Sequence, residues 1–283
     1  MQLEYVSCYI CNTRLTELWA EENAYQMVRC TNCGLVYLNP RPRLTDIEES
    51  ARIGMHRRAT GLLNTIGRYS ARRVSDFTLR ISELFPHEEL KSKPCRWLDL
   101  GAGYGEFVQA LSNLTASGSD LLGIEPCEAK VKKSKSLGIP LTNTRVSDIH
   151  AKFTHVSLIN VFSHLPNPVE FLGEIKSHME PSCQLVLVTG NAADIPRQEF
   201  PGSLYLPDHL SFVGESHIKA ILDNAGFTIK AINRHRLGYT NENYIMGLLR
   251  NSARVVLGRR PVPLKVPKTS RFRLLWIRAE LRE

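Results

Sequence analysis

The chain has 283 residues, of which 43% are hydrophobic and 23% charged, a composition typical of a soluble globular protein with a sizeable core. No apolar stretch reaches the ~18 residues that a membrane-spanning helix needs, and the N-terminus lacks the layout of a signal peptide. The formal net charge is +8, and we predict a cytoplasmic protein with one large domain and one small one.

The positive charge is concentrated near the C-terminus. Residues 227–283 contain thirteen Lys and Arg and three acidic residues, a surplus of ten that leaves about −2 for the first 226 residues. A basic segment of this kind can face a phosphate-bearing substrate, nucleic acid or an anionic membrane surface, and it can equally be a solvated face.

Two Cys-x-x-Cys pairs, separated by eighteen residues, stand near the N-terminus: Cys8, Cys11, Cys30 and Cys33. This spacing is typical of a zinc site with four thiolates, whose closed coordination shell makes the metal structural. Disulfides or a redox pair are the alternatives, and both are less favoured in a cytosolic chain. The residues Leu15–Val28 between the pairs are expected to form a short hairpin.

The zinc-binding module is expected to span residues 1–44. It includes the short strand within Leu35–Arg43, which Pro40 and Pro42 stop. Residues 45–94 carry helical spacing without a strand pattern, so we predict a linker or lid of two or three helices there.

From Cys95 onward, apolar runs alternate with amphipathic segments, a pattern that favours a parallel sheet with helices on both faces. We predict strands at Arg96–Leu100, Leu121–Glu125, Ile139–Thr142, His155–Phe162, Cys183–Thr189, Phe227–Ile232 and Phe272–Leu281. We predict helices at Gly105–Ser117, Cys127–Leu137, Val169–Met179 and Gly214–Ala225.

Residues 233–270 interrupt this pattern. Apolar residues recur at helical spacing from Tyr244 to Val256, with Arg250 and Arg254 one turn apart, so a basic amphipathic helix is expected. It could cover a substrate, form a dimer surface, lie on a membrane surface or pack on the domain's own core.

The strand ending at Leu100 runs directly into a glycine-rich turn with the order Asp99-x-Gly101-x-Gly103-x-Gly105. This order differs from the G-x-G-x-x-G of dinucleotide folds, and no Lys-Ser/Thr follows as in a phosphate-binding loop. Asp99 would repel a pyrophosphate but suits a ligand that carries an ammonium and a sulfonium. Glu125 ends the next strand, where it can accept hydrogen bonds from two ribose hydroxyls.

These residues resemble class I S-adenosylmethionine-dependent methyltransferases. The segments Asn160–Pro168, Leu206–Phe212 and Asn224–Phe227 are similar to three signatures of a bacterial branch whose members frequently begin with a four-cysteine zinc knuckle. In that branch a Tyr/Phe-x-x-Pro-Arg-Pro run follows the knuckle, as Tyr37–Pro42 does here.

The resemblance covers roughly residues 1–232 and the last strand. It implies a Rossmann-like α/β sheet, mostly parallel with the last strand antiparallel, in a methyltransferase domain at 95–283 that carries the insertion 233–270. It also implies a cofactor site for S-adenosylmethionine made of Asp99, Gly101, Ala102, Gly103, Tyr104, Gly105, Glu125, Pro126, Asp148, Ile149, Val161 and Phe162. Asp148 and Ile149 would flank the adenine, although Asp148 could instead cap a local turn.

His164 and His209 lie on loops beyond strand ends, on the side of the sheet where open α/β folds bind ligands. Either could act as a base or contact the substrate, or could simply hydrogen-bond a loop backbone. Two departures from the branch leave the substrate open: Ser163 stands where a glutamate is usual, and a linker tyrosine has no counterpart among Arg52–His56.

The sequence therefore predicts methyl transfer to a small molecule, namely a sugar, a nucleotide-linked sugar or another secondary metabolite. An RNA methyltransferase is the alternative, because the C-terminal segment is basic and a zinc module precedes the fold. It is less favoured since no Asn-Pro-Pro-Tyr loop follows the fourth strand. A non-catalytic cofactor-binding protein is a third interpretation. The sequence does not identify the acceptor atom or the oligomeric state.

Overall fold

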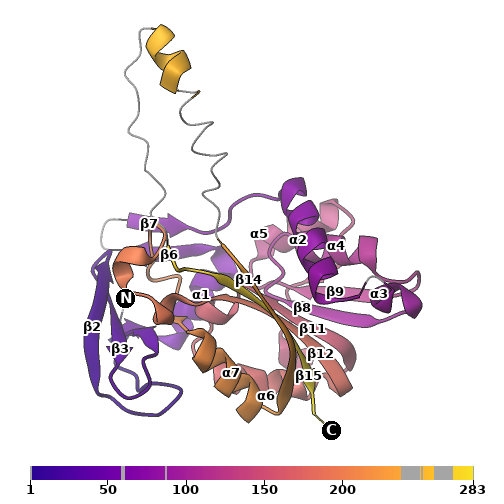
Figure 1. Cartoon of the computed structure of the whole chain (residues 1–283), viewed down its shortest axis with the longest axis horizontal. Coiled ribbons are helices and arrows are strands. Elements are labelled where there is room, and N and C mark those ends of the chain that lie inside the picture. Colours follow the sequence, from indigo (N-terminus) through magenta and orange to yellow (C-terminus); the bar gives the residue numbers. More distant parts are fainter. Residues whose placement is uncertain are drawn as a thin grey trace.

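The computed structural model describes residues 2–58, 61–86, 88–236, 249, 251–257 and 270–282. A seven-stranded sheet with helices on both faces lies beside a smaller four-stranded sheet (Figure 1). This is the mixed α/β architecture predicted from the sequence.

The large sheet has the strand order β10-β9-β8-β11-β12-β15-β14. Its neighbours pair in parallel except at β15, which is antiparallel to both β12 and β14. The predicted sheet, mostly parallel with its last strand antiparallel, is confirmed. The strands are β8 Arg96–Leu100, β9 Asp120–Ile124, β10 Leu141–Thr142, β11 Phe153–Ile159, β12 Met179–Gly190, β14 Phe227–His235 and β15 Leu274–Leu281.

The central strands of the sheet are buried on both faces, which explains why β8 and β12 contain continuous apolar runs, whereas the edge strand β14 alternates between buried and exposed residues. Val186 and Val188 of β12 pack with residues of α2 and α4, whereas Leu185 and Leu187 pack with residues of α6 and α7. The helices are α1 Leu44–Ile53, α2 Ala71–Leu84, α3 Glu89–Ser92, α4 Glu106–Leu114, α5 Glu128–Ser136, α6 Pro168–Lys176 and α7 Glu215–Asn224. In the described part of the chain, 3-10 turns lie at η1 Val146–Asp148, η2 Phe162–His164, η3 Ala192–Asp194 and η4 Arg197–Glu199.

The small sheet joins the N-terminal residues to a distant segment. Its order is β13-β4-β3-β2, and β13 pairs with β4 through Ser211 opposite Tyr37. Its strands are β2 Thr16–Glu22, β3 Tyr25–Cys30, β4 Val36–Leu38 and β13 Ser211–Phe212, and a separate pair is formed by β1 Leu3–Glu4 and β5 Arg41–Pro42. Because Cys8 and Cys30 belong to the same apolar cluster as the large sheet, the two sheets share a core.

The all-helical prediction for residues 45–94 is wrong in one respect. Gly54 ends α1 in the left-handed conformation, and the chain then forms the antiparallel hairpin of β6 Met55–Arg58 and β7 Gly61–Asn64. The sequence of this hairpin does not alternate between apolar and polar residues, so it does not look like a strand. Its buried side chain is that of the polar His56, and its two arginines are consecutive and lie near its tip.

The helix predicted within residues 244–256 lies partly outside the described residues. Leu249 and residues 251–256 are helical, and the side chains of Leu249, Val255 and Val256 are exposed. No helix in the described part of the chain is long and apolar enough to cross a membrane.

Candidate functional site

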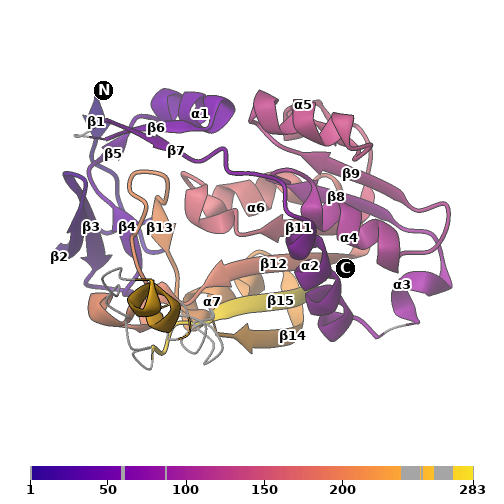
Figure 2. The ribbon, with the colours of Figure 1, turned by 90° about the horizontal axis from the view of Figure 1, so that it is seen from above.

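A cavity of about 1350 Å³ opens at the carboxyl ends of β8, β9 and β11, where it meets the N-terminal residues and the loop before β13. This exceeds the ~300–1,000 Å³ typical of a site for one ligand, so the cavity has room for two. On its rim α1 lies beside α5 (Figure 2), and Arg52 Nη1 is 2.9 Å from Glu128 Oε1.

The glycine turn between β8 and α4 needs its glycines for both conformation and space. Gly101, Gly103 and Gly105 have positive φ angles of 71°, 58° and 81°. A Cβ on Gly101 would lie 2.3 Å from Cγ2 of Val161, and one on Gly105 would lie 2.6 Å from Cγ2 of Ile139. The turn is therefore held tightly against the sheet.

Three buried carboxylates surround this turn: Asp99, Glu106 and Glu125 have exposed fractions of 1%, 3% and 5%. All three line the cavity. Asp99 Oδ1 accepts a 2.6 Å hydrogen bond from Ser157 Oγ, which accepts one from Trp97 Nε1 at 3.0 Å. Burial raises the pKa of Asp99 to about 7, against the lowering effect of the Ser157 hydroxyl.

Glu125 is fixed by three groups. Its Oε2 accepts from the Gly103 N–H at 2.8 Å, and its Oε1 accepts from the Cys127 N–H at 3.1 Å. Lys130 Nζ lies 3.5 Å from Oε1. The carboxylate is thus held at the glycine turn, and its contact with a ribose stays a prediction.

Glu106 was not among the predicted site residues. Its Oε1 accepts the Ser70 N–H at 3.1 Å, and it lies at the first position of α4 directly after Gly105. The only local signal was an acidic residue in the first turn of a helix, which is common because it complements the helix dipole.

A second cluster joins three separate segments on the same cavity. His164 Nδ1 lies 3.0 Å from the backbone O and 3.2 Å from Oδ1 of Asp208, and His56 Nε2 lies 3.0 Å from the same Oδ1. All three residues line the cavity. A carbonyl oxygen can only accept, so Nδ1 of His164 carries a proton and Nε2 of the neutral ring holds the lone pair.

The charges in this cluster support one another. Burial alone would raise the pKa of Asp208, but His164 and His56 outweigh it and hold the pKa well below its usual range. Burial alone would lower the pKa of His164, but Asp208 outweighs it and the pKa is raised. His164 is therefore a base of increased strength that is oriented by a carboxylate.

His209 has a different environment. Its ring centroid lies 4.6 Å from that of His164, and its Nδ1 donates to the Leu204 carbonyl at 2.7 Å. Burial lowers the pKa of His209 to about 4, so its ring is neutral at pH 7. It lies behind His164 rather than in the cavity wall. Of the two predicted candidates, His164 is therefore the one that lines the cavity.

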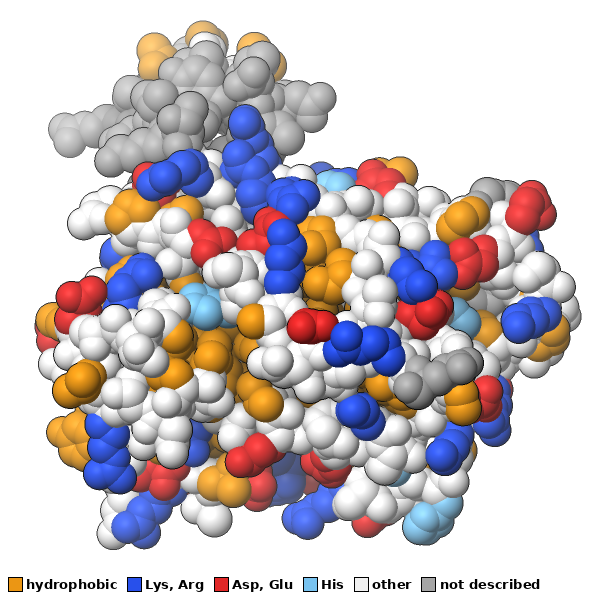
Figure 3. Space-filling model, turned by 60° about the horizontal axis from the view of Figure 1, so that its bottom comes forward, with side chains coloured by type: hydrophobic (Ala, Val, Ile, Leu, Met, Phe, Trp, Pro, Cys, Tyr) orange, Lys and Arg blue, Asp and Glu red, His pale blue; other side chains and the backbone are white. Residues whose placement is uncertain are grey.

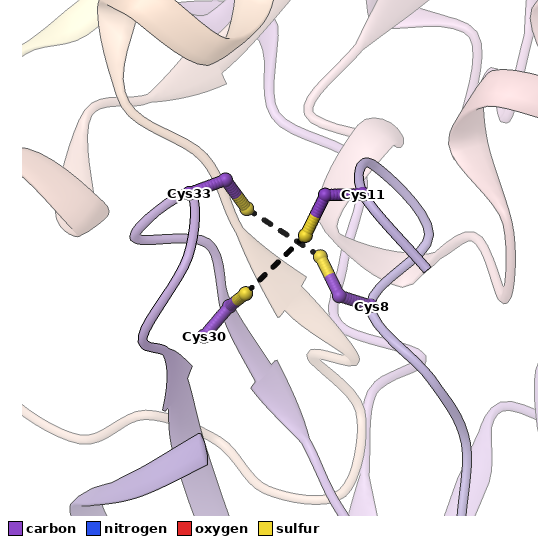
Figure 4. Close-up of side chains that lie close together, drawn as sticks. All are labelled: Cys8, Cys11, Cys30 and Cys33. Atoms are coloured by element: carbon purple, nitrogen blue, oxygen red, sulfur yellow. Dashed lines mark hydrogen bonds between the residues drawn. The ribbon is translucent and has the colours of Figure 1, made fainter. Parts of the chain in front are cut away.

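The four N-terminal cysteines lie together (Figure 4). The Sγ atoms of Cys8 and Cys33 and those of Cys11 and Cys30 are each 3.5 Å apart, and all four lie within 4.8 Å of one another. A tetrahedral zinc with Zn–S bonds of about 2.3 Å needs S···S separations of about 3.8 Å. The donor set and its geometry fit such a metal, and no disulfide joins the four cysteines.

His217 connects this cluster to helix α7. Its Nδ1 accepts from the Gly214 N–H at 2.9 Å, so its Nε2 carries the proton and donates to the Cys33 carbonyl at 2.6 Å. No local pattern predicts this contact, because it joins residues 184 positions apart.

A family model described as a methyltransferase domain matches residues 66–232. The chain belongs to this methyltransferase family. The match includes the glycine turn, Glu125 and the histidine cluster except His56. The sequence prediction of a methyltransferase is therefore confirmed.

Several solved structures are similar to this chain in fold. The chain shares 14% identity and a TM-score of 0.50 with an S-adenosylmethionine-dependent methyltransferase from Thermotoga maritima, over 75% of this chain and 91% of that one. It shares 11% identity and a TM-score of 0.53 with a Galdieria sulphuraria methyltransferase named for sarcosine and dimethylglycine, over 77% and 92%. A search of curated proteins found no match.

Most of the predicted cofactor residues of the methyltransferase lie in the cavity wall: Asp99, Gly101, Ala102, Gly103, Tyr104, Glu125, Pro126 and Val161. Gly105 packs against Ile139 behind the turn, and Phe162 is buried in the core. Asp148 and Ile149 directly follow Val146 and Ser147, which do line the cavity. The role of each residue toward the cofactor stays a prediction.

Proposed function

We propose that this methyltransferase transfers a methyl group from S-adenosylmethionine to a small polar molecule, with His164 as the general base. The observation that carries the proposal is the His164–Asp208 pair. It leaves Nε2 of a strengthened base at the wall of a cavity that also contains the glycine turn.

The three buried carboxylates support the choice of cofactor. Asp99, Glu106 and Glu125 make this end of the cavity a poor place for a pyrophosphate and a favourable one for a cation. The carboxylate of Glu125 would hold the ribose hydroxyls and the glycine turn would admit the methionine part. When bound, the cofactor supplies a methyl carbon that its sulfonium activates for in-line displacement.

Side chains of the protein would accept the proton that the methyl acceptor loses. His164 Nε2 would take the proton of the acceptor's attacking group, and the charge that develops on the ring would be stabilised by Asp208. His56, on the other side of the same carboxylate oxygen, would keep Asp208 ionised and oriented. The acceptor would lie between the glycine turn and the N-terminal residues.

Figure 3 shows one face of the molecule, on which Lys and Arg side chains are interspersed with Asp and Glu, while several basic side chains gather beside the residues drawn in grey. RNA stays an outcome of the test, because phosphate contacts would make binding fall steeply with salt.

We also propose that the four-cysteine cluster binds zinc. Closed coordination by thiolates would make this metal a structural one that contributes folding energy, rather than a participant in catalysis.

The test is a radioactive transfer assay. Tritiated methyl from S-adenosylmethionine is offered to sugars, nucleotide-linked sugars, other metabolites and RNA. With an acceptor in hand, His164→Gln is expected to lower kcat by about 10²- to 10⁴-fold, because the base is lost. Affinity for S-adenosylhomocysteine should stay within twofold. His150→Gln, at an exposed position, is the matched control. Full activity of H164Q would refute the assignment of the base.

Glu125→Ala is expected to weaken binding of S-adenosylhomocysteine by about 1–3 kcal/mol, because the hydrogen bonds to the ribose are lost. Isothermal titration calorimetry measures this without knowledge of the acceptor. Glu128→Ala, which removes an exposed carboxylate on the cavity rim, serves as the control and should change little. Equal affinities for the E125A variant and the wild type would contradict this placement of the ribose.

A further inference from the structure

The wall of the cavity next to the cysteine cluster contains three hydroxyl groups. Tyr9 follows the first cysteine, Tyr37 lies in β4, and Ser211 lies opposite Tyr37 in β13. All three residues line the cavity that also contains His164 and Asp208.

The two tyrosine hydroxyls differ in their partners. Tyr9 Oη lies 3.1 Å from Ser211 Oγ, so these two hydroxyls satisfy each other. Tyr37 is 3% exposed, and its hydroxyl has no hydrogen-bond partner in the described part of the chain. A buried hydroxyl without a partner opposes folding, so such a group calls for an explanation.

The strand pairing fixes the orientation of the Tyr37 side chain. β4 is an interior strand, and Tyr37 is paired with Val28 of β3 on one side and with Ser211 of β13 on the other. Its side chain therefore cannot be turned to the opposite face of the sheet without breaking both pairings.

Short hydrogen bonds connect this strand to the segment that carries the base. The Leu38 N–H donates to the Leu210 carbonyl at 2.8 Å, and the Leu210 N–H donates to the Ser163 carbonyl at 2.7 Å. Leu38 follows Tyr37 and Ser163 precedes His164, so both side chains come from neighbouring parts of one wall.

We propose that the Tyr37 hydroxyl is a hydrogen-bonding group for the methyl acceptor, so that the N-terminal module forms one wall of the acceptor subsite. The ligand group that fits is an oxygen, either a hydroxyl or a carbonyl, placed beside the atom that His164 deprotonates. The inference rests on the proposed function, since it assigns Tyr37 to the acceptor half of the same cavity.

The first experiment needs no acceptor and compares the thermal unfolding of Tyr37→Phe and Tyr9→Phe in the metal-loaded protein. Y37F loses no hydrogen bond, so its melting temperature should equal or exceed that of the wild type. Y9F breaks the pair with Ser211 and should melt about 2–4 °C lower. A fall of that size in Y37F would show a structural hydroxyl and overturn the proposal.

The second experiment uses ethylene glycol as a probe that offers two hydroxyls. Crystals with S-adenosylhomocysteine are soaked in the diol, and an oxygen is expected within hydrogen-bond distance of Tyr37 Oη in the wild type only. Density for the diol at the same place in Y37F crystals would overturn the proposal, as would no diol beside Tyr37. Failure of S-adenosylhomocysteine to bind would instead refute the proposed function.

With the acceptor from the transfer assay, Y37F is expected to raise its KM about 3- to 10-fold and to change kcat less than twofold. Trp19→Phe is the matched control, because it removes another buried unpartnered donor that lies outside the cavity wall. An unchanged KM in Y37F would overturn the proposal.

Discussion

Removal of the zinc that we propose for the four-cysteine cluster is expected to lower the melting temperature by about 10 °C or more and to abolish methyl transfer. Cys8 and Cys30 are buried in the same apolar cluster as Leu98 and Leu187 of the large sheet, so loss of the metal would loosen a shared core. It would also displace the wall that carries Tyr37. Thermal unfolding before and after chelation measures the effect.

The metal can be tested separately from the cofactor. Cys30→Ser is expected to reduce the bound zinc from one equivalent per chain and to match the chelated wild type in stability. Binding of S-adenosylhomocysteine should suffer less than turnover, because the glycine turn and Glu125 are held by contacts within the large sheet. Recovery on addition of zinc is the control. A purified protein without metal but with full stability would refute the zinc assignment.

The large sheet could be predicted because its information is local. Strands buried on both faces appear as short apolar runs. The glycine turn can be recognised because only glycine readily adopts the conformations that the turn requires. The hairpin β6–β7 could not be predicted, since its arginines and leucines show no period of two. β13 has only two residues, and nothing in Ser211–Phe212 reveals that it pairs with β4.

The same distinction between local signals and long-range contacts explains which residues of the site could be predicted. Asp99 and Glu125 could be predicted from the ends of adjacent strands, because the parallel sheet brings those ends together. The cluster around Asp208 depends on three segments that are far apart in sequence. His164 and Asp208 lie in segments that resemble family signatures, whereas His56 had no local signal. Tertiary packing alone brings His56 to within 3.0 Å of Asp208.

Asp208→Asn is expected to lower kcat by about 10²-fold or more, because the neutral amide no longer stabilises the cation that forms on His164. The pH profile should also move. In the wild type Asp208 raises the pKa of His164, so activity should rise as pH increases through this raised value. Without the carboxylate that pKa falls, and the acidic limb of kcat/KM should shift to lower pH.

The same substitution should change how stability depends on pH. Because folding raises the pKa of His164, the protonated ring stabilises the fold at low pH, and this contribution is lost as pH rises through the folded value. Asp208 acts in the opposite sense. Folding lowers its pKa, so its contribution is present above the unfolded value of about 3.9 and is lost as pH falls.

A direct measurement follows the imidazole of His164 by NMR, which requires no acceptor. In the wild type its pKa should exceed the ordinary value of about 6.5, and D208N should bring it down. Asp223→Asn makes the same chemical change at an exposed ion pair with Arg282 and should leave His164 unaffected. If the pKa of His164 were equal in D208N and the wild type, Asp208 would not be the group that strengthens the base.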